Sequence, residues 1–470
     1  GKPLKLIWNF TIPLLIGNLF QQLYNMADTF IVGRTIGVHA LAAVGSTGSI
    51  VFLIIGFATG LTAGLAIPLA QRFGAKDYKG VKHSFYVSIL ISIATAIVLT
   101  ALSMIFCRKI LEIRITPDAQ QSFHEYEKKQ VDSLSPEQIK EHLLQTGCWP
   151  LIKQRPYDVI ASVDSQPKAI FISACKTNPL APDYDYVLKG KEKELQVALT
   201  ALSKLTTGKV HVSVFKDSSL SPFRNLKDIV LHNISGPHPA GNVSTQIAKI
   251  SPINKGVVWV VSPQDLVVIG ELFLTGHLNL TRTVALTGAS METPHYVTAI
   301  AGAQIKGLVG TGVKDPTNTR IISGDVLTGQ KVCENTFLGF YDDQITAIPE
   351  GNDYDLLGWA KPISNKISLT RALTFSWLHP NKKYNLNTNT NGEQRAFVVT
   401  GMYEEVFPLD IYPMQLLKAC LYKDLDELEN LGAYEVAPED FALTEFVCVS
   451  KQPHQQIIRD GLDLMIQELG

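Results

Sequence analysis

Long apolar stretches fill the first 110 residues of the chain. Phe85 to Cys107 is a run of 23 residues without a charged side chain, and Ala40 to Ala70 is another of 31. At a helix rise of about 1.5 Å per residue, either run can cross the roughly 30 Å hydrocarbon layer of a bilayer. A further stretch, Leu6 to Val32, is interrupted by polar residues. The pattern predicts three transmembrane α-helices that contact the lipid bilayer through residues 6–107.

From about Asp118 the apolar runs become short and change in period. Ser135 followed by Pro136 and Gln138 is typical of a helix start, because serine caps the first turn and the glutamine can close a capping box. This helix is expected to end near Gly147. Residues 192–205 and 263–274 are predicted to be helices. Runs typical of strands lie at 168–174, 209–215, 256–261 and 282–286. Strands that alternate with helices predict a parallel sheet covered by helices.

The remainder of the chain changes pattern twice more. Short, Gly-punctuated strands dominate residues 293–400, and residues 401–470 return to helices with Pro413, Pro438 and Pro453 at expected first turns. We therefore expect a multidomain chain. Its expected parts are transmembrane helices at 1–117, a junction at 118–125, an α/β domain at 126–292, a β-rich region at 293–400 and a helical region at 401–470.

The net charge of −1 conceals an asymmetry along the chain. Residues 1–116 hold ten basic and three acidic residues, and the remainder holds 32 basic and 40 acidic residues. The basic residues of the first part lie between apolar runs and not on one polar face, which disfavours a nucleic-acid partner. The positive-inside rule places Lys2, Lys5 and the basic residues between the second and third runs in the cytoplasm, so three crossings would place residue 117 onward outside. Arg108, Lys109 and Arg114, which follow the third run, favour the cytoplasm for that part instead. The orientation is left open.

The chemical inventory of the soluble part is sparse. There is no G-x-G-x-x-G fingerprint, no P-loop and no C-x-x-C pair, so we expect no metal site and no catalytic residue. Six cysteines in 470 residues exclude a disulfide scaffold, and most are expected to be buried. His238 is a chemically attractive residue, but its turn at Gly236–Gly241 has two prolines and two glycines, which favours a structural role. The run Asn387–Gly392 is expected to satisfy a loop backbone.

Asp28 is the one candidate site residue of the apolar segment. A carboxylate inside a lipid-spanning helix costs at least about 2.5 kcal/mol on insertion scales, so Asp28 should face protein or water. One hypothesis is a proton- or sodium-coupling site. The other is a solvated residue at the helix end, since Arg34 follows six positions on.

The first part resembles the multidrug and toxic compound extrusion transporters. The resemblance is carried by Trp8–Pro13, Tyr24–Thr29, Val32–Arg34, Ala43–Gly45 and Ala70–Ala75, and it extends to Thr116-Pro117. In that family the carboxylate that matches Asp28 takes part in cation coupling. The family has many more helices, arranged in two lobes around a drug cavity. Three helices cannot enclose such a cavity, so we expect no transport by this chain alone.

The second part, from about Tyr126 to Gly470, resembles the NqrA family, which supplies the A subunit of the sodium-translocating NADH:quinone reductase. The matching runs occur in one order along the chain: Leu143–Gly147, Arg155-Pro156, Lys168–Phe171, Thr177–Ala181, Gly236–Gly241, Gly270–Gly276, Arg320–Gly329, Leu357–Ala360, Asn389–Gly392 and Pro408–Asp410.

This resemblance implies a peripheral subunit on the cytoplasmic face of a bacterial inner membrane. Its fold is similar to the flavin-binding NADH subunit of respiratory complex I, with a Rossmann-like domain, a soluble-ligand-binding-type β region and a helical domain. The flavin loop and cysteine cluster of that relative are not matched here, so no covalently bound cofactor is expected. NADH and flavin are expected on partner subunits, the membrane subunit with the quinone site is the expected neighbour, and ubiquinone or menaquinone is the expected small molecule.

Three hypotheses follow for function. The first is an NqrA-like component of the sodium pump, structural or quinone-contacting, without a complete active site of its own. The second is a fragment of a cation-coupled multidrug efflux transporter with a soluble appendage. The third is an artificial fusion of the two, joined near residues 116–120.

Overall fold

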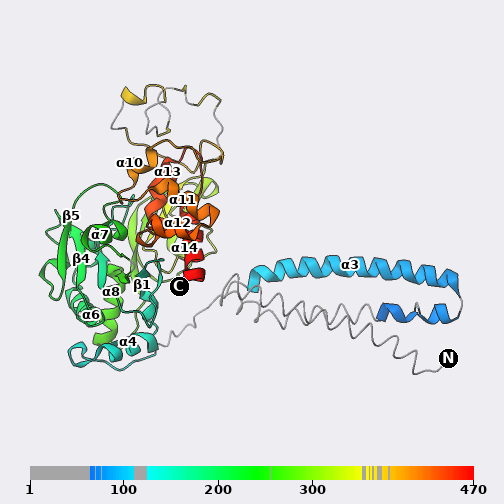
Figure 1. Ribbon diagram of the computed structural model, residues 1–470, viewed down its shortest axis with the longest axis horizontal. Helices are drawn as coiled ribbons and strands as arrows, with labels where there is room; N and C mark the ends of the chain where they lie inside the picture. Colours follow the sequence, from blue (N-terminus) through cyan, green and yellow to red (C-terminus); the bar gives the residue numbers. More distant parts are fainter. Residues whose placement is uncertain are drawn as a thin grey trace. The chain divides into compact units, whose positions relative to one another are not determined.

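The computed structural model describes residues 64–68, 70–75, 77–110, 124–254, 256–351, 356–358, 360–361, 365–367, 373–378 and 382–469. The chain divides into two compact units, Gly1–Gln121 and Ser122–Gly470, termed the N-terminal and C-terminal units. Figure 1 draws both units.

The described part of the N-terminal unit is helical. Helix α3 (Tyr78–Ile110) includes the whole predicted run Phe85–Cys107, and residues 64–68 and 70–74 are also helical. Among the residues that the structure describes, no helix has both the length and the apolar character needed to cross a bilayer. Asp28, the stretch 6–32 and most of 40–70 lie outside the described residues, so the three transmembrane helices stay a prediction.

A six-stranded sheet organises the first half of the C-terminal unit. Its strands are β1 (Ile152–Arg155), β2 (Val159–Ile160), β3 (Ala169–Ser173), β4 (Val210–Phe215), β5 (Val230–Ile234) and β6 (Val258–Val261). They lie in the order β2-β1-β6-β3-β4-β5. β6, β3, β4 and β5 run parallel, whereas β1 pairs antiparallel with both of its neighbours. The predicted parallel sheet is confirmed, and its strands at 168–174, 209–215 and 256–261 form as expected.

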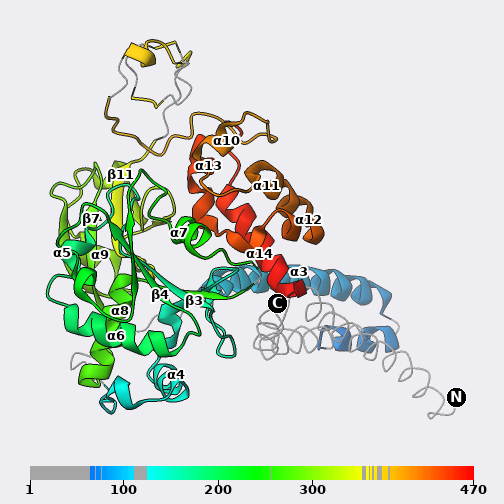
Figure 2. The same ribbon diagram turned by 60° about the vertical axis from the view of Figure 1, so that its left-hand side comes forward.

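Helices cover both faces of this sheet (Figure 2). They are α4 (Pro136–Gln145), α5 (Tyr184–Val187), α6 (Glu192–Lys204), α7 (Val243–Ile250) and α8 (Pro263–Thr275). One face packs into the large core with residues of α4, α6 and α8, and the other packs Phe171 and Val258 against Val243 and Ile247 of α7. The predicted capping box of α4 is confirmed: the Gln138 backbone N–H donates to Ser135 Oγ at 3.3 Å, and the Ser135 N–H to Gln138 Oε1 at 2.9 Å.

Helices α6 and α8 approach so closely that one position admits only glycine. A Cβ atom built on Gly270 of α8 would lie 1.9 Å from the Glu194 carbonyl oxygen of α6. Such a separation is a hard overlap with backbone that cannot rotate away. Gly270 therefore sets the distance between the two helices.

A second, five-stranded sheet follows. Its strands are β7 (Thr281–Thr287), β8 (His295–Ile300), β9 (Thr319–Ser323), β10 (Gln330–Val332) and β11 (Gln344–Pro349), in the order β10-β9-β11-β7-β8. Helix α9 (Ile305–Val309) packs on its core. The strand predicted at 282–286 forms, but it pairs with β8 and β11 and not with β6, so its assignment to the first sheet was wrong. Strand–helix–strand order does not distinguish two adjacent sheets from one.

The segment between β11 and the C-terminal helices is irregular where it is described. Between Gly351 and Gly401 the described residues contain no strand, so the strands expected there up to residue 400 do not form at those positions. The side chains of the Asn387–Gly392 run bond to nearby backbone as predicted. The Asn389 N–H donates to Asn387 Oδ1 and the Asn391 N–H to Asn389 Oδ1, both at 3.1 Å.

Five α-helices form the end of the C-terminal unit around their own core. They are α10 (Met402–Val406), α11 (Pro413–Tyr422), α12 (Leu425–Asn430), α13 (Ala442–Val447) and α14 (His454–Leu469). As predicted, Pro413 begins α11 and Pro438 begins a 3-10 helix, while Pro453 directly precedes α14. The 3-10 helices of the C-terminal unit are η1 (Val131–Ser133), η2 (Trp149–Leu151), η3 (Pro222–Asn225), η4 (Pro316–Asn318), η5 (Ser376–Leu378), η6 (Ala433–Glu435) and η7 (Pro438–Phe441).

A buried ionic network joins these helices to the first sheet. Arg155, at the end of β1, is buried and lies 3.0 Å from Glu439 Oε1 and 3.6 Å from Asp158 Oδ1. Burial alone would lower the pKa of Arg155, but the carboxylates of Asp158 and Glu439 raise it overall. The neighbouring Asp440 accepts from the Ala437 N–H at 2.8 Å. Burial, reinforced by Glu439 and opposed by Arg155, raises the pKa of Asp440 from 3.8 to about 7.

Asp440→Asn tests the cost of ionising this buried carboxyl. Because the folded pKa lies above the unfolded one, the folded chain binds the proton more tightly, and stability falls as pH rises from about 4 to about 7. At about pH 8 the variant should be more stable by on the order of 2 kcal/mol, and at about pH 5 it should match the parent. Urea unfolding at both pH values measures this, with exposed Asp426→Asn as the control. Equal effects at both pH values would contradict the assignment.

Gly270→Ala tests the contact between α6 and α8. The added Cβ should force the helices apart and destabilise the C-terminal unit by about 3 kcal/mol. Gly307→Ala is the matched control, because Gly307 also lies in a helix but has no atom within 4 Å of an added Cβ. That change should be neutral or stabilising by up to about 1 kcal/mol. Thermal unfolding of both variants measures the difference; similar melting temperatures would refute the close-approach argument.

Candidate functional site

The topology of the first sheet selects one position for a site. β3 lies between β4, to which the chain goes next, and β6, to which it returns after β5. In open parallel sheets, ligands bind at the carboxyl ends of strands where the strand order reverses. In this unit that switch point lies beyond Ser173 of β3 and Val261 of β6.

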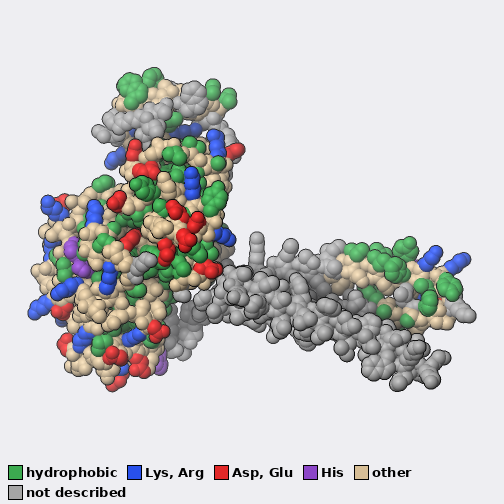
Figure 3. All heavy atoms as spheres, viewed as in Figure 1, with side chains coloured by type: hydrophobic (Ala, Val, Ile, Leu, Met, Phe, Trp, Pro, Cys, Tyr) green, Lys and Arg blue, Asp and Glu red, His purple; other side chains and the backbone are tan. Residues whose placement is uncertain are grey.

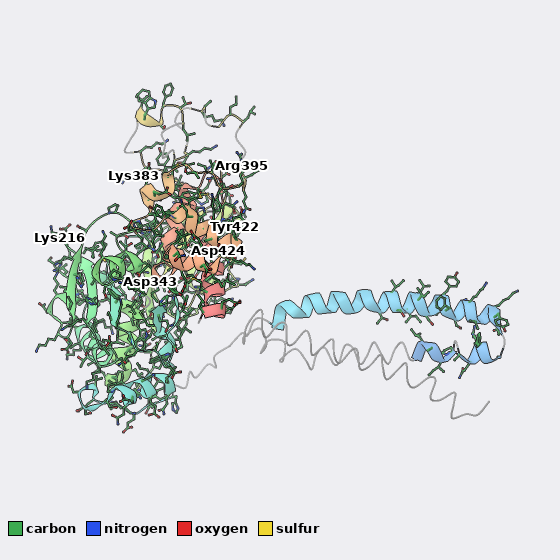
Figure 4. The ribbon with its side chains drawn as sticks, viewed as in Figure 1. Lys216, Asp343, Lys383, Arg395, Tyr422 and Asp424 are labelled. Atoms are coloured by element: carbon green, nitrogen blue, oxygen red, sulfur yellow. The ribbon has the colours of Figure 1, made fainter. Side chains whose placement is uncertain are left out.

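The loop after β3 carries the polar side chains of this site. Lys176 Nζ forms an ion pair with Asp343, which precedes β11 of the second sheet. Tyr184, at the start of α5, donates its hydroxyl to the other Asp343 oxygen at 2.8 Å. Burial, reinforced by the Asp343 carboxylate, raises the pKa of Tyr184 well above its ordinary value. Figure 4 labels Asp343 within the body of the C-terminal unit. The Asp343 carboxylate therefore pairs with both Lys176 and Tyr184.

A second carboxylate of the same sheet holds the next part of the loop. Asn178 Nδ2 donates to Asp325 Oδ2 at 2.7 Å. Asp325 also accepts from the backbone N–H groups of Leu327 and Thr328, at 2.7 and 3.1 Å, and from the Thr328 hydroxyl at 2.8 Å. Four donors saturate this buried carboxylate, so it is fixed in place and has little capacity left for a ligand.

The Gly236–Gly241 turn closes over the same loop. The Gly241 N–H donates to Thr177 Oγ1 at 3.0 Å, and a Cβ on Gly241 would lie 2.2 Å from the Cys175 carbonyl oxygen. His238 Nδ1 lies 3.1 Å from the same Thr177 hydroxyl. Burial lowers the pKa of His238, although Asp325 opposes the effect. The favoured interpretation of His238 as part of a packed turn agrees with these contacts.

Gln246 of α7 packs beneath the turn and bonds to the end of β3. Its Nε2 lies 2.8 Å from Ser173 Oγ, 3.2 Å from the Gly241 oxygen and 3.4 Å from Cys175 Sγ. Cys175 is buried, and burial raises the pKa of its thiol. A thiol of this kind is a poor nucleophile because the thiolate is the reactive form.

Most of the other cysteines in the described part of the chain are buried, as expected. Cys148, Cys420 and Cys448 are also buried, and Cys333 is exposed. Burial raises the pKa values of Cys148 and Cys420 to about 12.

The β6 side of the switch point is closed by a buried ion pair. Ser262 caps α8, accepting from the Asp265 N–H at 3.2 Å, and Asp265 lies 3.3 Å from Arg282 Nη2 of β7. Burial raises the pKa of Asp265, and Arg282 opposes this effect. A carboxylate in the first turn of a helix repels a phosphate, and the Ser262 hydroxyl already accepts one of the backbone N–H groups that a dinucleotide phosphate would need. The residues present do not fit a phosphate cradle.

The described residues also show no arrangement suited to a metal ion. No group of three or more His, Cys, Asp or Glu side chains is placed to hold a metal ion there. What the arrangement can do is join two sheets through paired charges and hydrogen bonds. The residues at the switch point form a cross-linked polar cluster.

Some residues of the polar cluster around Asp343 and Asp325 lie in stretches that the sequence had already indicated, but no role could be assigned to them from the sequence. Thr177, Asn178 and Asp325 lie in runs that carried the resemblance to the reductase family, whereas Lys176, Tyr184 and Asp343 were not singled out. One available signal was the concentration of polar residues directly after the apolar run 169–172. The pairing with Asp343 has no such signal, because it spans 167 positions. Asp28, the sequence-predicted site residue, lies outside the described residues.

Family models match three stretches of the chain. The model described as the NqrA second alpha/beta domain matches residues 134–278, and the NQRA C-terminal domain matches residues 283–334. The model described as MatE matches residues 13–123. The two parts inferred from sequence thus match two different families.

Curated relatives cover most of the chain, and three of them illustrate the match. The A subunit of the Na(+)-translocating NADH-quinone reductase of Vibrio atlanticus (strain LGP32) is 37% identical over 358 residues, which are 76% of this chain and 79% of the relative. The same subunit of Haemophilus influenzae (strain PittGG) is 37% identical over 360 residues, with the same coverage. That of Neisseria meningitidis serogroup B (strain ATCC BAA-335 / MC58) is 37% identical over 348 residues, 74% of this chain and 77% of the relative.

A solved NAD+-reducing [NiFe]-hydrogenase in the air-oxidized state is also similar, at 14% identity, a TM-score of 0.34 and coverage of 47% of this chain and 50% of that one. A likeness at this level carries no argument about function.

The pairing of Lys176 with Asp343 yields a test of the cross-link. Lys176→Met and Asp343→Asn should each destabilise the C-terminal unit, since either leaves a charge without its partner in a mostly buried position. A double-mutant cycle should give a coupling of about 1–3 kcal/mol, at the lower end because the Lys176 side chain is 30% exposed. Exposed Lys216→Met, labelled in Figure 4, is the control. Denaturant unfolding measures the free energy of unfolding of the two single variants, the double variant and the control. If the two single changes in this free energy add up to that of the double variant, the pair does not join the sheets.

Proposed function

The chain belongs to the NqrA family of Na(+)-translocating NADH-quinone reductase subunits, and from this membership we propose that it acts as the NqrA-like component of such a complex. The observation that carries the proposal is the 37% identity over 358 residues, which spans 79% of a relative. In this role the chain binds the other subunits of the reductase, with the membrane subunit that holds the quinone site as its closest neighbour.

The proposed role is structural or quinone-contacting, without a redox cofactor on this chain. The cluster at the switch point supports this because Lys176 and Tyr184 are already paired with Asp343, and Asn178 with Asp325. A flavin or dinucleotide phosphate would have to displace these pairs and approach the Asp265 carboxylate. NADH and flavin are therefore assigned to partner subunits, and ubiquinone or menaquinone is the small molecule that this chain contacts.

The proposed location is the cytoplasmic face of a bacterial inner membrane. The relatives are named as parts of a sodium-translocating quinone reductase, and quinones and ion translocation both require a membrane. The three N-terminal transmembrane helices at residues 1–117 belong to the same proposal, supported by the uncharged runs at 40–70 and 85–107.

A second candidate function is favoured by the MatE match at residues 13–123. In this alternative the chain is a fragment of a cation-coupled multidrug efflux transporter with a soluble appendage, and Asp28 is the cation-coupling carboxylate. A third possibility is that the chain is an artificial fusion of an efflux-transporter fragment and an NqrA-like part. It is supported by the fact that the MatE match ends at residue 123 and the NqrA match begins at residue 134. Sequencing of source DNA across residues 116–120 distinguishes a natural gene from a fusion.

Copurification tests the first proposal. The tagged full chain is coexpressed with the other reductase subunits of a relative such as that of Haemophilus influenzae, and the tag is used to isolate the assembly. We expect the membrane subunits to copurify, and a photoreactive ubiquinone analogue to label the assembly. An unrelated tagged membrane protein of similar size is the control. If the chain retains no other reductase component and takes no quinone label, the proposed role is wrong.

A further inference from the structure

Strand β8 forms one edge of the second sheet. Among the described residues it pairs with β7 alone, in the antiparallel direction. The pairing continues at its end, where the Ala301 N–H donates to the Leu280 oxygen at 3.0 Å. In an antiparallel pair, residues that bond to the neighbouring strand alternate with residues whose N–H and C=O groups point away from it. This alternation directs the backbone groups of Tyr296, Thr298 and Ile300 away from β7.

The other edge of the same sheet is protected against pairing, whereas β8 is not. Strand β10 has three residues, and its central Lys331 is exposed. Short edge strands and lysines are two devices that prevent a second molecule from adding a strand. Strand β8 has six residues, and no Lys, Arg, Asp, Glu or Pro occurs from His295 to Ile300. Figure 3 shows charged side chains spread over the visible face of the C-terminal unit, so the absence of charge from β8 is a local feature.

The outer face of β8 carries uncharged side chains. Alternate side chains of the strand enter the core of the second sheet, and the others are exposed. The exposed ones are Tyr296, Thr298 and Ile300. The Tyr296 ring stacks on Tyr186 of α5 with 5.1 Å between ring centroids, and its hydroxyl accepts from the Asp183 N–H at 2.9 Å. These contacts hold the tyrosine in place without using its backbone groups.

We propose that β8 pairs with β8 of a second copy of this chain, antiparallel and around a two-fold axis at Thr298. In this register the two Thr298 residues lie opposite each other, and Tyr296 of each copy lies opposite Ile300 of the other. All of these are hydrogen-bonded positions, because the three residues direct their N–H and C=O groups outward. The second sheets of the two copies become one continuous sheet.

The residues of β8 favour a second copy as the occupant. Thr–Thr pairs and pairs of an aromatic with a β-branched residue are favourable across strands, and no like charges meet in this register. The strand therefore supplies its own complement, which a strand of another protein has no reason to match. The Ile300 oxygen already accepts from the Ala303 N–H at 3.0 Å, but a carbonyl oxygen can accept two bonds. Self-pairing at β8 does not depend on the proposed function.

Disulfide trapping tests this register. Thr298→Cys is introduced into the full chain with Cys107 and Cys333 replaced by serine, since the other four cysteines are buried. The purified chain is oxidised with copper phenanthroline, and mass spectrometry identifies the cross-linked peptides. Opposed hydrogen-bonded residues have Cα atoms about 5.5 Å apart, within reach of a disulfide. Ile300→Cys is the matched control, because its two copies would lie four strand positions, or roughly 13 Å, apart.

The expected result is a 298–298 disulfide between two copies, at least about tenfold more abundant than a disulfide at position 300. Ile300→Pro combined with Thr298→Cys should lower the 298 disulfide at least about fivefold, because the lost N–H points away from β7 and bonds only to the second copy. Thermal unfolding that matches the parent chain shows that this variant keeps its fold.

Three outcomes would overturn the proposal: no disulfide at position 298, equal disulfides at 298 and 300, or a 298 disulfide that Ile300→Pro leaves unchanged. If oxidation in cells joins position 298 to a different polypeptide, the edge binds a partner strand and the proposal is wrong. Copurification with the reductase subunits is measured independently, so either proposal can fail without the other.

Discussion

A buried carboxylate must be paired, and this requirement holds the C-terminal unit together. Asp343 and Asp325 belong to the second sheet region, and each accepts from the loop after β3 of the first sheet. Removal of the loop from either partner would leave a charge in a water-poor position, a state that costs several kcal/mol. The two sheets are therefore coupled at the point where related α/β folds open to receive a ligand. The polar contacts at this point fix how the two sheets are arranged.

The same rule operates where the C-terminal helices meet the first sheet. Arg155 has carboxylates on two sides, from Asp158 close by in the chain and from Glu439 in η7. Backbone N–H groups of Ile253 and Asn254 add a neighbouring tie by donating to Glu435, at 2.9 and 2.7 Å. The three parts of the unit are joined by polar contacts between their loops, while each keeps its own apolar core. These polar contacts fix the positions of the three parts within the C-terminal unit.

Local signals in the sequence predicted local structure well. The Ser135 cap, the Pro413 start and the strands at β3, β4 and β6 all follow from rules that act over a few residues. Contacts between distant segments could not be predicted in the same way. Lys176 and Asp343 are 167 positions apart, and Arg155 and Glu439 are 284 apart. Their pairing depends on how two finished sheets and a helical bundle pack, and no periodicity encodes that. The strand at 281–287 was assigned to the wrong sheet for this reason, since its own residues specify a strand but not its neighbours.

The shortness of β2 has a consequence for the behaviour of the chain at high concentration. Strand β2 has two residues, Val159 and Ile160, and it pairs along the outer side of β1. A long, exposed edge offers a row of free backbone groups on which a second molecule can add a strand. Here the edge strand β2 is too short for a strand of a second molecule to pair with it. The sheet is thereby protected from edge-to-edge self-association on that side during the interval between synthesis and assembly.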